Sequence, residues 1–201
     1  MAEGGSVAAM GRLGKVYHYG RGVPKDLHLA RRWLRRAQER DFVWFPEYYE
    51  TLLASDEKFH DEACKRCIAL SDKGVKHAYV YRARMYRDGF GCEKNADEAI
   101  AWYRKGVSEG MVLAAMELFE IFWANPSPAT DKEMIDAILP FANRGSPGCM
   151  GRLGRAYHYG RGVPVNLAMA ERWTAKACEK DPARWSKGLE TIRLKRKSEK
   201  R

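Results

Sequence analysis

The chain has 201 residues, of which 45% are hydrophobic and 31% charged, and a formal net charge of +10. This composition is globular, and one domain is enough to account for the length. It excludes a membrane protein, since no apolar run approaches the roughly 18 residues of a span. The first residues, MAEGGSVAAMGRLGK, hold no apolar core, so we expect no signal peptide.

A segment near the start of the chain is repeated near its end. Residues 10–34 read MGRLGKVYHYGRGVPKDLHLARRWL, and residues 150–174 read MGRLGRAYHYGRGVPVNLAMAERWT. About two-thirds of the positions are identical, and the block YHYGRGVP is unchanged. The copies lie 140 residues apart, which is four periods of about 35 and falls in the range of helical solenoid repeats.

The first copy has the pattern of two helices joined by a tight turn. Gly20 and Gly22 end the first helix and supply the positive φ angles that such a turn needs. Asp26 is placed to cap the second helix, in which Ala30 and Trp33 lie on the buried side. The apolar face of the first helix is formed by Ala9, Leu13, Gly14 and Tyr17.

Three further repeats fit between the copies. Residues 78–102 form an intact repeat 3, with Gly89, Gly91 and the cap Asn95 in the expected columns. Repeat 2, in residues 45–74, and repeat 4, which starts at Ala114, are degenerate because they lack the glycine turn. The sequence therefore predicts an all-α protein with five helix-turn-helix repeats in residues 1–182.

The last segment, residues 183–201, is predicted to be a capping helix followed by a basic tail. Its apolar positions are Trp185, Leu189, Ile192 and Leu194. A terminal repeat needs a cap because its outer face has no neighbour. We expect Trp185→Asp to destabilise the last repeat most.

The columns shared by the intact repeats read Ala-x3-Leu-Gly-x2-Tyr-x2-Gly-x-Gly-Val-x3-Asp-x3-Ala-x2-Trp. This pattern resembles the Sel1-like repeat (SLR), a relative of the tetratricopeptide repeat, from about Ser6 to Pro182. The resemblance implies a right-handed α-solenoid without catalytic residues. It also implies a function in binding other proteins, as an adaptor, a scaffold, an inhibitor or an immunity protein.

In solenoids of this type, the resemblance implies, the first helix of each pair lines the concave surface. The positions between its apolar columns are predicted to be exposed and to bind a partner. They are Arg12, Lys15, His18, Tyr19, Tyr81, Arg84, Arg87, Trp123, Arg152, Arg155, His158 and Tyr159. Arginine and aromatic side chains suit an acidic or aromatic-containing segment of a partner protein. The alternative is an ordinary solvated helix face.

No group of residues indicates catalysis, a cofactor or a metal. His18 and His158 occupy one repeat column, and no nucleophile accompanies either. Cys64 and Cys67 follow His60 at metal-ligand spacing, but a zinc site needs four ligands, so we expect core cysteines. The tryptophans of the second helices are also expected in the core. Five cysteines, none in repeat 1, indicate a reducing, cytoplasmic environment.

The positive charge is concentrated at the two ends. Residues 1–41 hold nine basic and four acidic side chains, and residues 183–201 hold eight and two. Nucleic-acid or anion binding by these ends is therefore an alternative function. The tail lacks the interleaved aromatic residues that stack on bases, which favours a protein partner. Self-association stays open, since repeats 1 and 5 are so alike.

Overall fold

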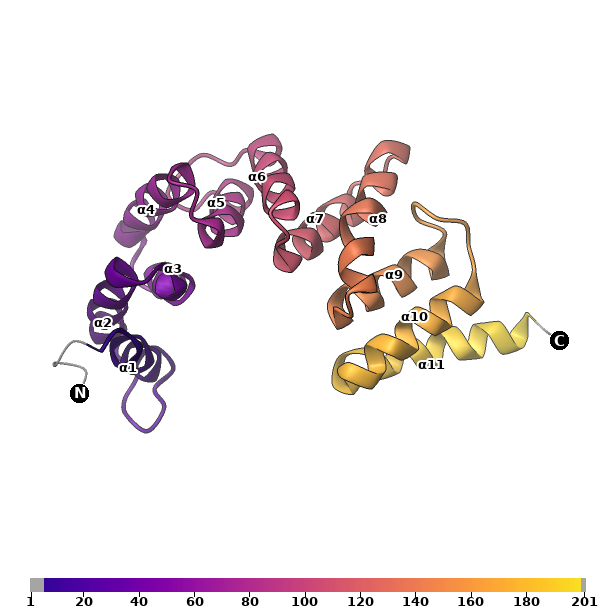
Figure 1. Cartoon of the computed structure of the whole chain (residues 1–201), viewed down its shortest axis with the longest axis horizontal. Helices are drawn as coiled ribbons and strands as arrows, with labels where there is room; N and C mark the ends of the chain where they lie inside the picture. The colour runs from indigo at the N-terminus through magenta and orange to yellow at the C-terminus, as the bar shows by residue number, and fades with distance from the viewer. Residues whose placement is uncertain (1–5, 200–201) are drawn as a thin grey trace. The chain divides into compact units, whose positions relative to one another are not determined.

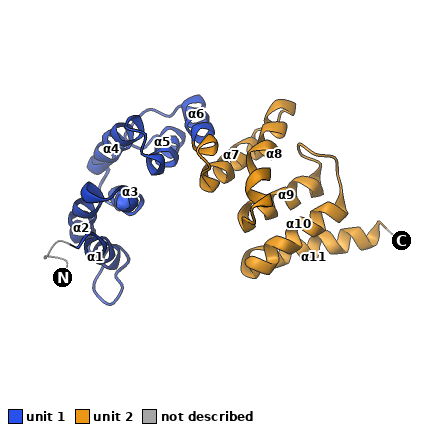
Figure 2. Cartoon of the chain, in the orientation of Figure 1, with its two compact units in different colours: residues 1–105 blue, residues 106–201 orange. Residues whose placement is uncertain are grey.

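A computed structural model describes residues 6–199 of the chain, and within this range it holds eleven α-helices, two short 3-10 helices and no strand. The prediction of an all-α fold is confirmed. The chain forms two compact units, residues 1–105 and 106–201 (Figure 2). The boundary falls inside α6.

In the N-terminal unit, the first helices α1, α3 and α5 lie along one side and the second helices α2 and α4 along the other (Figure 1). The bounds are α1 Val7–Tyr19, α2 Leu27–Arg40, η1 Phe42–Trp44, α3 Phe45–Leu53, η2 Glu57–Phe59, α4 His60–Asp72, α5 Lys76–Asp88 and α6 Ala96–Ser108. Repeats 1, 2 and 3 are thus the pairs α1–α2, α3–α4 and α5–α6.

The C-terminal unit contains repeats 4 and 5, and α11 packs against α10 (Figure 1). Its helices are α7 Val112–Ala124, α8 Pro128–Asn143, α9 Pro147–Tyr159, α10 Leu167–Lys180 and α11 Pro182–Ser198. The segment expected to cap the repeats is therefore helical through Ser198, with Leu189 and Ile192 buried. Leu194, which we also placed on its apolar face, is 61% exposed.

The turns and caps of the intact repeats form as the sequence predicts. Asp26, Asn95 and Asn166 each accept a backbone N–H at 2.8–3.0 Å in the first turn of the second helix. The six turn glycines have φ between 67° and 79°. Gly20 and Gly160 close α1 and α9 in the left-handed conformation, which other residues adopt at a cost.

Glycines also let the helices of a pair approach closely. A Cβ at Gly14 would lie 2.5 Å from Leu34 Cγ in α2, and one at Gly154 would collide with Thr174 Oγ1 in α10. One turn earlier in each first helix, Gly11 lies under the Trp44 ring and Gly151 under the Trp185 ring. Trp44 at the end of η1 and Trp185 of α11 therefore cover repeats 1 and 5 in the same way.

The core of the N-terminal unit is aromatic and holds two cysteines. Phe45, Tyr48 and Tyr49 of α3 are fully buried. Cys64 and Cys67 are buried among them, so the prediction of core cysteines is confirmed. Burial raises the pKa of Cys64 to about 11, with Cys92 adding to the effect, so this thiol stays protonated near neutral pH.

The tryptophans of the second helices are not fully in the core, and that part of the prediction is wrong. Trp33, Trp102 and Trp173 are half-buried. Each ring is covered by the cation three residues later, at 5.6 Å for Arg36, 4.6 Å for Lys105 and 5.2 Å for Lys176. Residues three apart share a helix face, so these cations shield the rings from water.

Candidate functional site

The sequence Tyr-His-Tyr ends α1 and α9, and a pocket opens beside each copy. The pocket in the N-terminal unit has a volume of about 160 Å³. The one in the C-terminal unit has a volume of about 210 Å³. Both are lined by the same four repeat columns, Lys15, His18, Tyr19 and Leu34 in the first and Arg155, His158, Tyr159 and Thr174 in the second.

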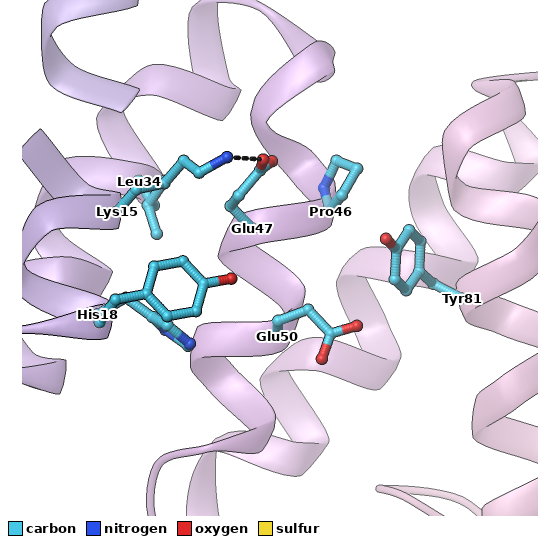
Figure 3. Close-up of a pocket in the computed structure, with 8 residues that line it drawn as sticks. Lys15, His18, Leu34, Pro46, Glu47, Glu50 and Tyr81 are labelled. Carbon is cyan, nitrogen blue, oxygen red and sulfur yellow. Dashed lines mark hydrogen bonds and ion pairs between the residues drawn. The ribbon is translucent and has the colours of Figure 1, made fainter. Parts of the chain in front are cut away.

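The N-terminal pocket, which we call the α1 pocket, combines an apolar lining with carboxylates (Figure 3). Leu34, Pro46 and Tyr81 give apolar surface, and Glu47 and Glu50 come from α3. Lys15 Nζ lies 3.0 Å from Glu47 Oε1. Arg84 reaches Glu50 at 3.4 Å. Both carboxylates are therefore partly neutralised.

The neutral imidazole of His18 is held in one tautomer by its neighbour. Its Nδ1 lies 2.8 Å from Thr51 Oγ1, and the Thr51 hydroxyl donates to the Glu47 carbonyl at 2.7 Å. Because that hydroxyl proton is already used, Nδ1 of His18 is the donor. Burial, followed by the charge of Lys25, lowers the pKa of His18, so the imidazole is neutral at pH 7.

The C-terminal pocket, which we call the α9 pocket, is less charged because α11 supplies no carboxylate to it. Trp185, Gly188, Thr191 and Ile192 of α11 line it instead. Three polar atoms of its lining are buried without a hydrogen-bond partner: Arg155 Nε, Thr174 Oγ1 and Trp185 Nε1. An unpaired buried polar group is costly, so these atoms lower the stability of the α9 pocket's lining.

Three residues predicted to be exposed are buried, and that part of the prediction is wrong. Tyr81 lies 4.7 Å from the Tyr49 ring, because its column faces the first helix of the preceding repeat. Arg152 faces α7 for the same reason, and only 7% of it is exposed. His158 stacks on Tyr159 at 4.5 Å and lies in the pocket that α11 lines.

The remaining predicted site residues stay at least partly accessible. Tyr19 and Tyr159 are 54% and 62% exposed. Trp123 is half-buried, with the guanidinium groups of Arg155 and Arg161 at 4.2 and 4.9 Å from its ring centre. Arg12 and Arg87 are exposed, while Lys15, His18, Arg84 and Arg155 are half-buried.

The surface is less basic than the sequence suggested, because the cations pair with carboxylates of a neighbouring repeat. Arg152 and Arg155 both bind Glu120 of α7, at 2.8 and 2.7 Å. Lys15 and Arg84 bind Glu47 and Glu50 of α3. The partners lie 32 to 35 residues apart, about one repeat. That spacing is the signal by which sequence reasoning could have found Glu47 and Glu50.

The architecture places the chain among α-solenoids built from helical hairpins. The family model described as "Sel1 repeat" matches residues 7–41, 76–111 and 147–182, more than half of the chain. The chain belongs to the Sel1 repeat family. The three matches are the repeats that the sequence identified as intact. Sel1 repeat proteins generally mediate protein–protein interactions, and their fold is typically non-catalytic.

Solved structures with the same fold come from several bacteria. A Sel1 repeat protein from Oxalobacter formigenes has a TM-score of 0.65 at 21% identity, over 88% of this chain and 74% of that one. The protective antigen c5321 of uropathogenic Escherichia coli, which displays an SLR fold, gives 0.55 at 22% identity over 89% of this chain. The match spans only 47% of c5321.

A third structure, the Pseudomonas aeruginosa protein PA5086, gives a TM-score of 0.55 at 19% identity, over 90% of this chain and 72% of that one. At these identities the likeness shows the fold alone. No curated protein matches the chain. Across residues 6–199, no helix is long and apolar enough to cross a bilayer.

Proposed function

We propose that the chain is a non-enzymatic protein-interaction module, an adaptor, scaffold or inhibitor, that holds segments of a partner protein in the α1 and α9 pockets. The observation that carries this proposal is the recurrence of a pocket at the same four columns of repeats 1 and 5. Each pocket sits beside a tyrosine that is more than half exposed. Exposed aromatic side chains beside a pocket are typical anchors of protein interfaces.

The two pockets favour different parts of a partner. The α9 pocket places the half-buried cation Arg155 next to the apolar surface of Trp185 and Ile192. It suits a carboxylate or a backbone carbonyl flanked by an apolar side chain, which agrees with an acidic partner segment. The α1 pocket, with Glu47 and Glu50 at its edge, suits an aromatic side chain that carries a hydrogen-bond donor.

The test is capture of protein partners from native lysate by the wild-type chain and by Tyr19→Ala/Tyr159→Ala. Both tyrosines are exposed, so the variant keeps its fold. Nuclease treatment and a wash at about 200 mM salt remove material that binds through phosphates. We expect a stoichiometric protein that the variant loses. Val165→Ala, at an exposed position away from both pockets, is the control and should keep it.

The Tyr159→Ala variant tests the α9 pocket by itself, because Tyr159 lines this pocket and is 62% exposed. If the pocket binds the partner, affinity falls by about fivefold to tenfold, while thermal stability is unchanged. Equal affinity for both chains would remove the α9 pocket from the proposal.

A second candidate is binding of a polyanion by α2. His28, Arg31, Arg32, Arg35 and Arg36 line one hollow with a volume of about 410 Å³, together with Glu39, Tyr48 and Glu62. The basic end of α11 is partly neutralised, because Arg193 and Arg196 bind Glu171. Recovery of nuclease-sensitive material alone, lost between about 50 and 200 mM salt, would favour this candidate.

Two further expectations belong to the same proposal. Residues 183–201 act as the C-terminal cap of the repeats, which the burial of Leu189 and Ile192 supports. All five cysteines are free. Free thiols persist in a reducing compartment, which supports a cytoplasmic place of action.

A further inference from the structure

The glycine turn of each intact repeat has a defined place to dock. A Cβ at Gly91 would collide with the carbonyl oxygen of His60, and one at Gly162 with that of Asp131. Both oxygens lie in the first turn of the preceding repeat's second helix, α4 or α8. Only glycine allows this approach. In repeat 1, no described atom lies within 4 Å of the same position at Gly22.

The residue between the two glycines contacts the same first turn. In repeat 3 it is Phe90, whose ring lies 5.3 Å from the His60 ring. In repeat 5 it is Arg161, whose Nε lies 2.9 Å from Asp131 Oδ2. The guanidinium of Arg161 also donates to the carbonyls at the end of α7, Phe122 at 3.2 Å and Trp123 at 3.3 Å. The residue between the glycines therefore suits the side chain that it contacts in the preceding repeat, an aromatic ring against His60 and a cation against Asp131.

Repeat 1 also has an arginine between its two turn glycines, but the described residues hold no repeat before it. Arg21 stands in the same octapeptide, YHYGRGVP, as Arg161. Arg21 is exposed, and its guanidinium lies 5.0 Å from the Tyr19 ring.

A second column behaves in the same way. Tyr81 packs on Tyr49, and Arg152 binds Glu120 at 2.8 Å, in each case on the preceding first helix. The equivalent residue of repeat 1, Arg12, is exposed. In repeat 5, Arg152 and Arg161 bind carboxylates. Their equivalents in repeat 1, Arg12 and Arg21, are exposed.

We propose that the face of repeat 1 formed by Arg12, Tyr19, Arg21 and Gly22, here called the open face, docks a helical hairpin of a partner protein. The hairpin carries one carboxylate on its first helix, as Glu120 does, and one in the first turn of its second helix, as Asp131 does. A backbone carbonyl in the first turn of its second helix lies against Gly22. The open face shares Tyr19 with the α1 pocket, whereas Arg12, Arg21 and Gly22 line neither pocket. The inference, tested through Arg21, therefore does not depend on the proposed function.

Charge decides between a partner protein and a second copy of the chain. The last described helix, α11, and the residue after it expose Arg184, Lys187, Lys195 and Lys197 against Glu190 and Glu199, while Arg193 and Arg196 are paired with Glu171. Their net charge is positive. Such a surface repels the arginines of the open face. The face that does bind these arginines, on α7 and α8, is already occupied by α9 of its own chain. An acidic hairpin from another protein therefore fits best.

The probe for the test is a labelled peptide with the sequence of residues 112–144, the hairpin α7–α8, titrated with the full chain. We expect Arg21→Glu to weaken its binding by about tenfold. Arg32→Glu, the same charge change at an exposed position of α2, is the control and should leave binding unchanged. A peptide with Asp131→Arg should bind the Arg21→Glu chain better than it binds wild type.

A covalent version keeps the proposal testable if the free peptide does not fold. Residues 112–144 are joined directly to Gly5, where Gly5-Ser6 repeats the natural junction Gly145-Ser146. In this fused chain Arg21→Glu should lower the melting temperature by about 3 °C or more, and in the unfused chain it should have almost no effect. Equal effects in both chains would overturn the proposal.

The state of association gives the remaining outcome. Sedimentation of the wild-type chain should show a monomer. A dimer that Arg21→Glu dissociates would mean that a second copy fills the open face, and the partner hairpin would then be wrong.

Discussion

Repeats 1 and 5 share an unchanged octapeptide and differ in what surrounds it. In repeat 5, Leu153 is fully buried, Arg161 binds Asp131, and Gly162 lies against the backbone of α8. In repeat 1, Leu13 is half-buried and Arg21 is exposed. One segment therefore serves as a repeat-to-repeat contact in one place and as accessible surface in the other. In a solenoid, neighbours decide what a residue does.

Repeats 1 and 5 each also pack against the segment that follows them in the chain. These two contacts are alike in packing and differ in charge. Trp44 and Trp185 cover Gly11 and Gly151 in the same way. The helix that follows repeat 1 brings Glu47 and Glu50 to its pocket, whereas α11 brings Thr191 and Ile192. The duplicated Tyr-His-Tyr segment thus gives two pockets with different chemistry.

Loss of the C-terminal cap should have the largest effect. Trp185→Asp removes the ring that covers Gly151 and places a charge in the α9 pocket. We expect about 4 kcal/mol of destabilisation, measured by chemical denaturation. Leu194→Asp, at an exposed position of the same helix, should stay within about 0.5 kcal/mol of wild type. A matching melt for Trp185→Asp and wild type would disprove the capping role.

Replacing the second turn glycine with alanine in each repeat compares repeats 1 and 5 through the free energy of unfolding. Gly162→Ala meets both the strain of a positive φ and a collision with the backbone of α8, so we expect about 3 kcal/mol of destabilisation. Gly22→Ala has the strain alone and should cost about 1 kcal/mol. Equal costs would mean that the two turns have equivalent surroundings.

Replacing the arginine between the two glycines with glutamate compares repeats 1 and 5 through the loss of an ion pair. Arg161→Glu breaks a half-buried ion pair and places two carboxylates together, at a cost of about 2 kcal/mol. Arg21→Glu should change the free energy of unfolding by less than about 0.5 kcal/mol. Urea unfolding of both variants measures the difference, and an Arg21→Glu effect as large as that of Arg161→Glu would show a covered repeat 1.

Gln38 of repeat 1 is fully buried, and neither atom of its amide has a hydrogen-bond partner. The equivalent residue of repeat 5 is Cys178. Gln38→Met keeps the length of the side chain and removes the unpaired groups, so we expect about 1 kcal/mol of stabilisation. A lower melting temperature would show that the amide is paired in solution.

The smallest expected effect is a pH dependence of the folding stability, caused by His18 and His158 in the two pockets. Burial lowers the pKa of His18 and of His158 in the folded chain. The unfolded chain therefore binds more protons, and stability falls as pH drops below about 6.5. His18→Gln/His158→Gln should lose less stability than wild type between about pH 7.5 and 5.5. The same pH dependence in both chains would contradict this assignment.

The sequence was sufficient for the turns and the helix caps of the intact repeats. Asp26 and Asn166 cap their helices, and Gly20 and Gly160 end theirs, because these are local properties of residue type and spacing. The helix in the C-terminal segment, α11, was predicted from the spacing of Trp185, Leu189 and Ile192.

Contacts between repeats could not be derived from helix periodicity. Tyr81 and Arg152 lie outside the apolar face of their own helix, and only the preceding first helix buries them. Periodicity identifies the face turned to the partner helix and gives no information on the face turned to the next repeat. The pairing of Lys15 with Glu47 and of Arg84 with Glu50 depends on that second face.

Hydrogen–deuterium exchange tests the central comparison most directly. Residues 17–24 and 157–164 have the same sequence, so the amides of residues 18–24 and 158–164 have equal intrinsic exchange rates and their protection can be compared directly. The flanking residues differ, which lets mass spectrometry distinguish the two peptides. An open turn in repeat 1 predicts exchange about tenfold faster in residues 17–24 than in residues 157–164. Equal protection of the two segments would contradict the open face of repeat 1.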